Sequence, residues 1–110
     1  MVETDYSCPC LDTCPLSKSM DVIGGKWKMQ ILCTLNTSGP LRYNEVRRKM
    51  EGVSNTVLVK ALRELTEAGL VRRNEYMEVP VRVEYETTKI CDDLIPILEN
   101  LSNWCEKNLL

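Results

Sequence analysis

The most reactive side chains in this sequence are thiols, and Cys14 is the thiol whose surroundings most favour reactivity. Cys14 directly precedes Pro15, a residue typical of the first turn of a helix, and Lys18 follows one turn later. A helix N-terminus and a nearby cation both favour the thiolate, which is the nucleophilic form of cysteine. The sequence therefore predicts that Cys14 is a reactive thiol. The alternative is a half-buried, unreactive helix cap.

The other thiols favour less specific interpretations. Cys8 and Cys10 could join Cys14 as zinc ligands, but the spacing C-x-C-x3-C matches no standard structural zinc site. We therefore expect no metal and no cofactor. Cys33 is expected to be an inert small core residue. A thiol enzyme is disfavoured because the chain has no Cys-x-x-Cys pair, no βαβ pattern and no histidine to act as a base.

A second group of functional candidates lies on one face of a helix predicted to follow Ser54, which is a good N-cap. Asn55 can pair with adenine, Thr56 can contact a thymine methyl group or a phosphate, and Lys60 can reach guanine or phosphate. These contacts would place the helix in the major groove of double-stranded DNA. The alternative is an exposed polar helix face that has no partner.

Basic residues around this helix are expected to contact the DNA backbone. Those beside a short preceding helix would position the protein rather than read the sequence. Arg82, just beyond the tip of a predicted cationic hairpin, could reach phosphate or a narrow minor groove. Only one of the adjacent Arg72 and Arg73 can face the DNA. The candidate DNA-binding residues are Arg42, Tyr43, Arg47, Arg48, Ser54, Asn55, Thr56, Lys60, Arg72 and Arg82.

The distribution of charge favours a polyanionic partner, although the net charge of the chain is −2. Residues 42–73 contain eight basic and four acidic side chains, whereas residues 74–110 contain three basic and eight acidic ones. For DNA binding, the local excess of positive charge matters more than the total. A solvated charged surface without a partner is the alternative.

The elements that would position these residues follow from apolar periodicity and turn signals. We expect helices over residues 14–23, 26–35, 45–50 and 89–108, and one from Ser54 as N-cap to Gly69 as its terminating residue. The third of these helices would have Asn44 as its cap. Residues 36–40 would break the second helix, residues 41–43 would form an edge strand, and residues 71–77 and 81–87 would form a hairpin. The last helix carries a wide apolar stripe: Leu94, Ile97, Leu98, Leu101 and Trp104.

This order predicts a mostly helical α+β fold: a winged helix-turn-helix with a small antiparallel wing sheet and N- and C-terminal dimerisation helices. Residues 1–13 are expected to form a flexible, cysteine-containing arm, and residues 14–110 the folded domain. The N-terminus lacks the basic and apolar segments of a secretory signal, and no apolar run is long enough to cross a bilayer. We therefore expect a cytoplasmic protein without a membrane partner.

Several segments together carry a resemblance to a known family. They include Asp21-Val22-Ile23-Gly24-Gly25-Lys26-Trp27, Gly39-Pro40-Leu41-Arg42-Tyr43-Asn44-Glu45 and Val79-Pro80-Val81-Arg82-Val83-Glu84-Tyr85. Through them, residues 14–106 resemble the HxlR-type family of winged helix-turn-helix transcriptional regulators, which is close to the MarR-like proteins. The chain departs from the family pattern at Val81, Cys91 and Cys105.

The resemblance implies a homodimer, joined through its first and last helices, that binds operator DNA as a repressor or activator. It also implies thiol sensing, because family members use a cysteine at the Cys14 position. We predict a repressor of this kind that responds to an electrophile or another small-molecule inducer. Cys105 would then form an intersubunit disulfide with Cys14, in competition with Cys8 and Cys10. The alternatives are a regulator that answers to a non-covalent ligand and a winged-helix interaction module that does not bind DNA.

Overall fold

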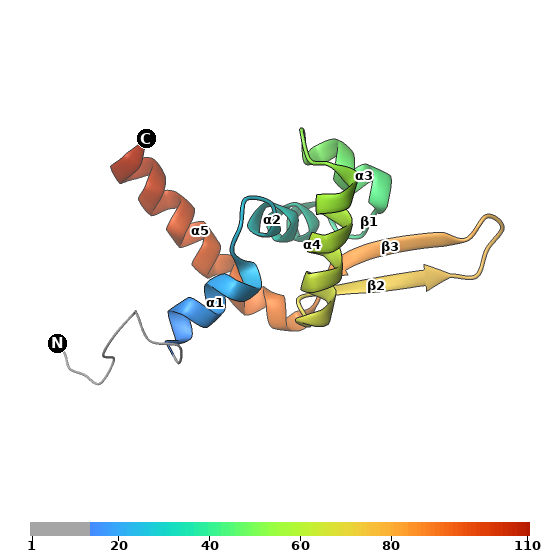
Figure 1. Ribbon diagram of the computed structural model, residues 1–110, viewed down its shortest axis with the longest axis horizontal. Helices are drawn as coiled ribbons and strands as arrows, with labels where there is room; N and C mark the ends of the chain where they lie inside the picture. The colour runs from blue at the N-terminus through green and yellow to red at the C-terminus, as the bar shows by residue number, and fades with distance from the viewer. Residues whose placement is uncertain (1–13) are drawn as a thin grey trace.

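The computed structural model describes residues 14–110, which form five helices and a small three-stranded sheet whose hairpin extends to one side of them (Figure 1). The helices are α1 (Pro15–Ile23), α2 (Lys28–Ser38), α3 (Tyr43–Lys49), α4 (Asn55–Glu67) and α5 (Lys89–Leu109). The strands are β1 (Leu41–Arg42), β2 (Val71–Tyr76) and β3 (Arg82–Thr87). This arrangement confirms the predicted winged helix-turn-helix fold. The predicted arm, residues 1–13, lies outside the described residues. No helix within residues 14–110 is both long and apolar enough to span a membrane.

Local signals set both ends of α4. The Ser54 hydroxyl accepts a hydrogen bond from the main-chain N–H of Val57 at 3.2 Å, which confirms the predicted N-cap. At the other end, Gly69 adopts a left-handed φ of 83°, and the N–H of Leu70 bonds to the carbonyl oxygen of Leu65 at 3.0 Å. The helix therefore stops where the hairpin must begin.

The sheet has the strand order β1-β3-β2, and both pairings are antiparallel. Val71 lies opposite Thr87 at the base of the β2–β3 hairpin, and Tyr76 lies opposite Arg82 near its tip. β1 is the predicted edge strand. The hairpin projects from the body on the side away from the C-terminal end of α5 (Figure 1).

The hydrophobic core lies where α2, α3, α4, β2 and the first turns of α5 meet. Its largest fully buried side chains are Ile31, Leu32, Leu35, Val46, Leu58, Leu62, Leu65, Val71 and Cys91. Each buried aliphatic side chain contributes about 1.5–3 kcal/mol relative to an exposed one. The buried residues of α4 are Leu58, Ala61, Leu62 and Leu65, so this helix packs on the core through one face and leaves the other face exposed.

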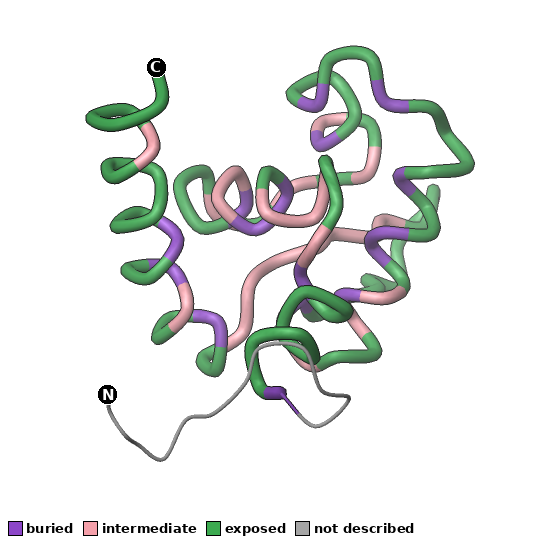
Figure 2. Tube along the Cα trace, turned by 60° about the vertical axis from the view of Figure 1, so that its left-hand side comes forward, coloured by how far each residue is buried: buried purple, intermediate pink, exposed green. Residues whose placement is uncertain are grey.

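α1 and α5 both leave apolar side chains exposed. The side chains of Ile97, Leu101 and Trp104 on α5 are exposed. On α1, the side chains of Leu16 and Met20 are exposed as well. Figure 2 shows that the C-terminal turns of α5 are almost entirely exposed. Of the predicted α5 stripe, Ile97, Leu101 and Trp104 are therefore exposed, whereas Leu98 is buried in the core and Leu94 packs against it.

The end of α2 differs from the predicted one. The helix runs through Ser38 instead of stopping at residue 35. The N–H of Gly39 bonds to the carbonyl oxygen of Leu35 at 2.9 Å, and Gly39 itself has a left-handed φ of 83°. The glycine is therefore the true stop, because it adopts this conformation without the steric cost that a side chain would add.

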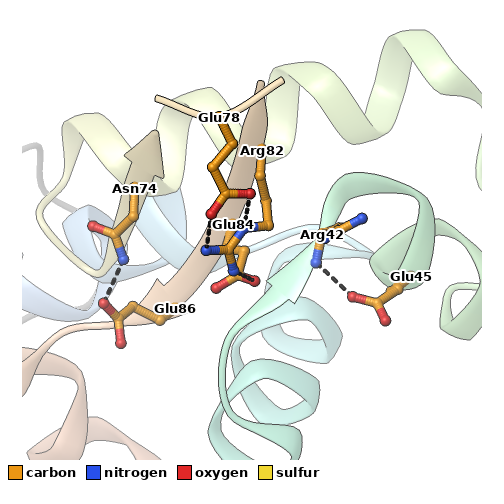
Figure 3. Close-up of polar contacts among 7 residues, drawn as sticks. All are labelled: Arg42, Glu45, Asn74, Glu78, Arg82, Glu84 and Glu86. Atoms are coloured by element: carbon orange, nitrogen blue, oxygen red, sulfur yellow. Dashed lines mark hydrogen bonds and ion pairs between the residues drawn. The ribbon is translucent and has the colours of Figure 1, made fainter. Parts of the chain in front are cut away.

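The start of α3 also differs. Asn44 lies within the first turn and is not the cap that the sequence predicts. Instead, the main-chain N–H of Arg42 donates to the carboxylate of Glu45 at 2.8 Å (Figure 3). A glutamate three residues into the helix therefore satisfies the N–H that precedes it.

Candidate DNA-binding surface

The outer face of α4 is exposed. Thr56, Lys60 and Arg63 lie on it, and Ser54 and Asn55 are exposed at its start. The ion pairs among residues 14–110 include neither Lys60 nor Arg63. A helix with a buried inner face and unpaired cations outside is suited to the major groove of DNA.

Four more cations lie on and just before α3: Arg42, Arg47, Arg48 and Lys49. All four side chains are exposed, and none belongs to an ion pair within the described part of the chain. Arg42 and Arg48 line one surface hollow together with Glu84 of β3. Arg47 and Arg48 line another. The structure thus brings the predicted backbone-contacting residues of α3 together.

A hydrogen bond joins two of the predicted DNA-contacting residues. The hydroxyl of Tyr43, at the start of α3, donates to the side-chain oxygen of Asn55, at the start of α4. The same hydroxyl lies 3.4 Å from the main-chain oxygen of Asn55. The amide oxygen that would accept a bond from adenine is therefore already engaged within the protein.

The hairpin is not the cationic ribbon that its arginines suggest, because each arginine is paired with carboxylates. Arg72 lies 3.3 Å from Glu86, Arg73 lies 3.4 Å from Glu75, and Arg82 lies within 3 Å of Glu78 and Glu84. Asn74 adds a hydrogen bond to Glu86 at 2.6 Å (Figure 3). Within the candidate DNA-binding surface, the cations that have no ion-pair partner among residues 14–110 therefore lie beside α3 and on α4, not on the hairpin.

Arg82 is the most constrained of these arginines. Its Nη2 lies 2.9 Å from a Glu78 oxygen and its Nη1 lies 2.8 Å from a Glu84 oxygen (Figure 3). Its guanidinium also lies 4.1 Å from the ring centroid of Tyr76. Hydrogen bonds to Glu78 and then to Glu84 raise the pKa of Arg82. To reach a phosphate, Arg82 must exchange one set of oxygen partners for another.

A further link connects the outer flank of α4 to α1. The Nζ of Lys28 lies 2.8 Å from Glu64 and donates to the carbonyl oxygen of Val22 at 3.1 Å. The hydrogen bond and charge of Lys28 lower the pKa of Glu64. Sequence analysis missed this contact because no local pattern brings the start of α2 to the middle of α4.

Comparison with known proteins decides the class of this domain. A family model described as HxlR-like helix-turn-helix matches residues 22–110. The chain belongs to the HxlR-like helix-turn-helix family. It is a helix-turn-helix transcriptional regulator and not an enzyme.

Relatives of this HxlR-like chain match most of its length. An uncharacterised helix-turn-helix transcriptional regulator from Methanothermobacter thermautotrophicus is 43% identical over 91 residues, which cover 83% of this chain and 69% of that protein. The regulator YdeP of Bacillus subtilis is 37% identical over 103 residues, which cover 94% and 80%. Among solved structures, the redox regulator HypR in its oxidized form is 39% identical with a TM-score of 0.79. That match covers 86% of this chain and 97% of the HypR chain.

The two thiols predicted to sense oxidants lie on the terminal helices of this HxlR-like domain. Cys14 is the N-cap residue of α1, and it is only 4% exposed. Cys105 is half-buried near the end of α5. The predicted competitors Cys8 and Cys10 lie outside the described residues.

Two further thiols belong to the interior. Cys91 is fully buried in the hydrophobic core, and Cys33 packs against the same core. Burial raises the pKa of both thiols, and the nearby Glu99 and Asp92 carboxylates raise those of Cys33 and Cys91 respectively. Both therefore remain protonated and poorly nucleophilic at neutral pH, which agrees with the inert role predicted for Cys33.

The site holds no metal centre within the described range: no three His, Cys, Asp or Glu side chains of residues 14–110 are grouped so that they could bind an ion. The zinc alternative drawn from the sequence requires Cys8 and Cys10, which lie outside that range.

An apolar hollow of about 520 Å³ separates α1 from the start of α5. Its lining consists of Lys18, Ser19, Val22, Ile23, Leu70, Ile90, Asp93, Leu94 and Ile97. The hollow adjoins the exposed apolar surface of these two helices, so either a second subunit or a small apolar ligand fits its chemistry.

Proposed function

We propose that this protein is a homodimeric, cytoplasmic repressor that binds double-stranded operator DNA in a sequence-specific manner. α4 would enter the major groove, α3 would lie across the backbone, and the hairpin would contact the flanking duplex. The observation that carries the proposal is the outer face of α4. Its inner side is buried, and its outer side presents Lys60 and Arg63 without an ion-pair partner among the described residues.

The candidate residues divide into two roles. Ser54, Asn55, Thr56 and Lys60 lie where the N-terminal turns of a recognition helix meet base edges. Arg42, Arg47, Arg48, Arg72 and Arg82 would position the protein on phosphates, and Tyr43 lies beside them with its hydroxyl donating to Asn55. Because α1 and α5 have exposed apolar faces, two copies would pair through these helices. The dimer would then present two α4 helices to the same side of the duplex, so the half-sites should lie about one helical turn apart or a multiple of it.

Selection of binding sites from random DNA by the reduced protein tests this proposal. Lys60→Ala should weaken binding to the selected operator and relax the preference, since a good base contact is worth about 1–3 kcal/mol. Lys107→Ala is a matched control, because it removes an exposed lysine from the last turn of α5. It should bind as the wild type does. Failure to enrich any sequence would instead indicate an interaction module.

The proposed signal is oxidation or alkylation of Cys14. Three observations support it: the helix N-cap position of Cys14, the Lys28 link from α1 to α4, and the similarity to HypR, a redox regulator. With diamide, Cys14 and Cys105 of the other subunit would together lose two electrons and two protons, and diamide would be reduced to the hydrazine. Because Cys14 is buried in the single chain, we expect this reaction to require local opening of the start of α1.

Diamide treatment should release DNA from the wild type and give a covalent dimer on non-reducing gels. Cys14→Ser should stay bound to DNA under the same treatment. Cys33→Ser is the matched control, since its thiol is poorly nucleophilic, and it should respond like the wild type. An unchanged response of Cys14→Ser would contradict thiol sensing at this residue.

The hollow between α1 and α5 supports a second candidate signal, a non-covalent apolar ligand. A ligand bound there would change how the two helices pack and thereby the separation of the two α4 helices. Under this alternative, Cys14→Ser keeps its response, whereas filling the hollow with Ile97→Trp removes it.

A further inference from the structure

The Tyr43–Asn55 hydrogen bond fixes the direction of a side chain at the start of α4. The Tyr43 ring is half-buried and packs against the hydrophobic core, so its hydroxyl is held in place. That hydroxyl donates to the Asn55 side-chain oxygen. Asn55 is the first residue of α4 and is exposed. Its amide therefore has its acceptor turned toward Tyr43 and its NH₂ group available for an external partner.

This direction changes what Asn55 can recognise. An asparagine pairs with adenine through two bonds, in which its oxygen accepts from N6 and its nitrogen donates to N7. With the oxygen engaged by Tyr43, only the donor half of that pair remains. An outward NH₂ group would also lie opposite the N6 amino group of adenine or the N4 amino group of cytosine. Both are hydrogen-bond donors, so no bond forms between them and the NH₂ group.

We infer that Tyr43 is a specificity-determining positioning residue, which makes Asn55 a donor-only reader of keto bases in the major groove. Guanine presents O6 and thymine presents O4 as acceptors at this edge, so either base accepts a bond from the Asn55 amide. On the strand that faces Asn55, cytosine offers only a donor and adenine offers its N7 acceptor beside the N6 donor, so both are disfavoured relative to guanine, which offers two adjacent acceptors. The inference rests on the proposed function, because it assumes that α4 lies in the major groove.

The matched pair of variants is Tyr43→Phe and Tyr76→Phe. Tyr43→Phe removes one hydroxyl and keeps the ring in the core, so Asn55 is free to turn its oxygen outward. Tyr76→Phe removes a hydroxyl on β2 and leaves the ring that stacks on Arg82. Binding-site selection and titration against all four bases at the Asn55 position would compare both variants with the wild type.

The wild type and Tyr76→Phe should favour guanine or thymine at this position. Tyr43→Phe should gain affinity for adenine by about tenfold relative to the wild type, which is the size of one good bidentate contact. Asn55→Ala should lose the preference at this position alone. Tyr43→Phe added to Asn55→Ala should change nothing further, because Tyr43 acts through Asn55.

Three outcomes would overturn the inference. The first is a Tyr43→Phe protein that keeps the wild-type preference. The second is a change in preference that persists when Asn55 is alanine. The third is an Asn55→Ala protein that loses affinity equally for all sequences, which would show a phosphate contact. In each case the wild type still selects an operator, so the DNA-binding proposal survives. Failure of the wild type to select any sequence would overturn both.

Discussion

The Nζ of Lys28 lies 2.8 Å from the Oε1 of Glu64, so the start of α2 is joined to the outer flank of the candidate recognition helix. The Lys28 ammonium group also donates a hydrogen bond to the carbonyl oxygen of Val22 at the end of α1. α1, whose N-cap is Cys14, is therefore connected to α4 through the Lys28 side chain. A change in the packing of α1 has a short physical route to the DNA-binding surface.

The stability contributed by this pair should depend on pH in a defined direction. The pKa of Glu64 is lowered below its ordinary value of 4.5, so the folded state favours the carboxylate. This contribution is present above pH 4.5 and is lost as the pH falls through the lowered pKa. A double-mutant cycle of Lys28→Met and Glu64→Gln, measured by urea unfolding across this range, should show coupling that disappears in acid. Glu67→Gln on the same helix is the control. Coupling that does not change with pH would contradict the assignment.

The same link should carry the signal from Cys14. Lys28→Met should bind the operator when reduced but should lose less affinity than the wild type upon diamide treatment. The physical reason is that α1 and α4 would no longer be joined through a charged side chain. Fluorescence anisotropy of labelled operator, before and after treatment, measures the difference. An unchanged ratio of the two affinities would show that the signal travels by another route, such as rotation of the whole subunit.

The carboxylates around Arg82 should oppose DNA binding. Replacing Glu78 and Glu84 by glutamine frees Arg82 and removes two negative charges, so affinity should rise for operator and unrelated DNA alike. The slope of log K against log salt should steepen by about one, the value for one added phosphate contact. Titrations between about 50 and 200 mM salt test this. The gain should be smaller when Arg82 is alanine. An equal gain in that background would assign the effect to the carboxylates alone.

The exposed stripe on α5 should join two subunits. The Leu101 side chain is 45% exposed, and Leu101→Asp should give monomers because it places a charge in an apolar contact. Val79→Asp on the fully exposed hairpin tip is the control and should leave the oligomeric state unchanged. Sedimentation of both variants at micromolar concentration measures this. A monomeric wild type would contradict the homodimer.

Alkaline pH should destabilise the fold through Cys91. Its pKa is raised above 9.0 by burial, so the folded state favours the thiol while the unfolded chain ionises. Stability is therefore complete below pH 9.0 and falls as the pH rises toward the raised pKa. Cys91→Ala should cost about 1 kcal/mol at neutral pH and should show a shallower alkaline decline. Unfolding curves from about pH 8 to 10 compare the two proteins, and equal slopes would contradict this role.

Those elements whose signals are local were predictable from the sequence. Ser54 and Gly69 mark α4 by capping and backbone conformation, and the spacing of Leu58, Leu62 and Leu65 marks its buried face. The end of α2 was misplaced because Asn36 to Ser38 resemble a loop, although an exposed helix end tolerates them and only Gly39 stops the helix.

The candidate site was less predictable, because its decisive contacts depend on how the side chains are oriented once the chain has folded. The sequence identifies Tyr43 and Asn55 as candidates for DNA contact, but not that the Tyr43 hydroxyl donates to the side-chain oxygen of Asn55. It identifies Arg82 as a cation, but not that Glu78 in the turn and Glu84 on the same strand both pair with it. Such pairings depend on register and packing, which a residue pattern does not encode.

Pro96 lies inside α5, and it lacks the N–H that would bond to the carbonyl oxygen one turn earlier. Before it, α5 buries Cys91 and Ile95 in its own domain; beyond Leu98, the helix is mostly exposed. In a dimer, Pro96 would be a flexible point between the first turns of α5, which pack on the DNA-binding domain, and the later turns, which would pack on the second subunit. Bending at this point would let the distance between the two DNA-binding domains vary, so one regulator would tolerate operators whose half-site spacings differ.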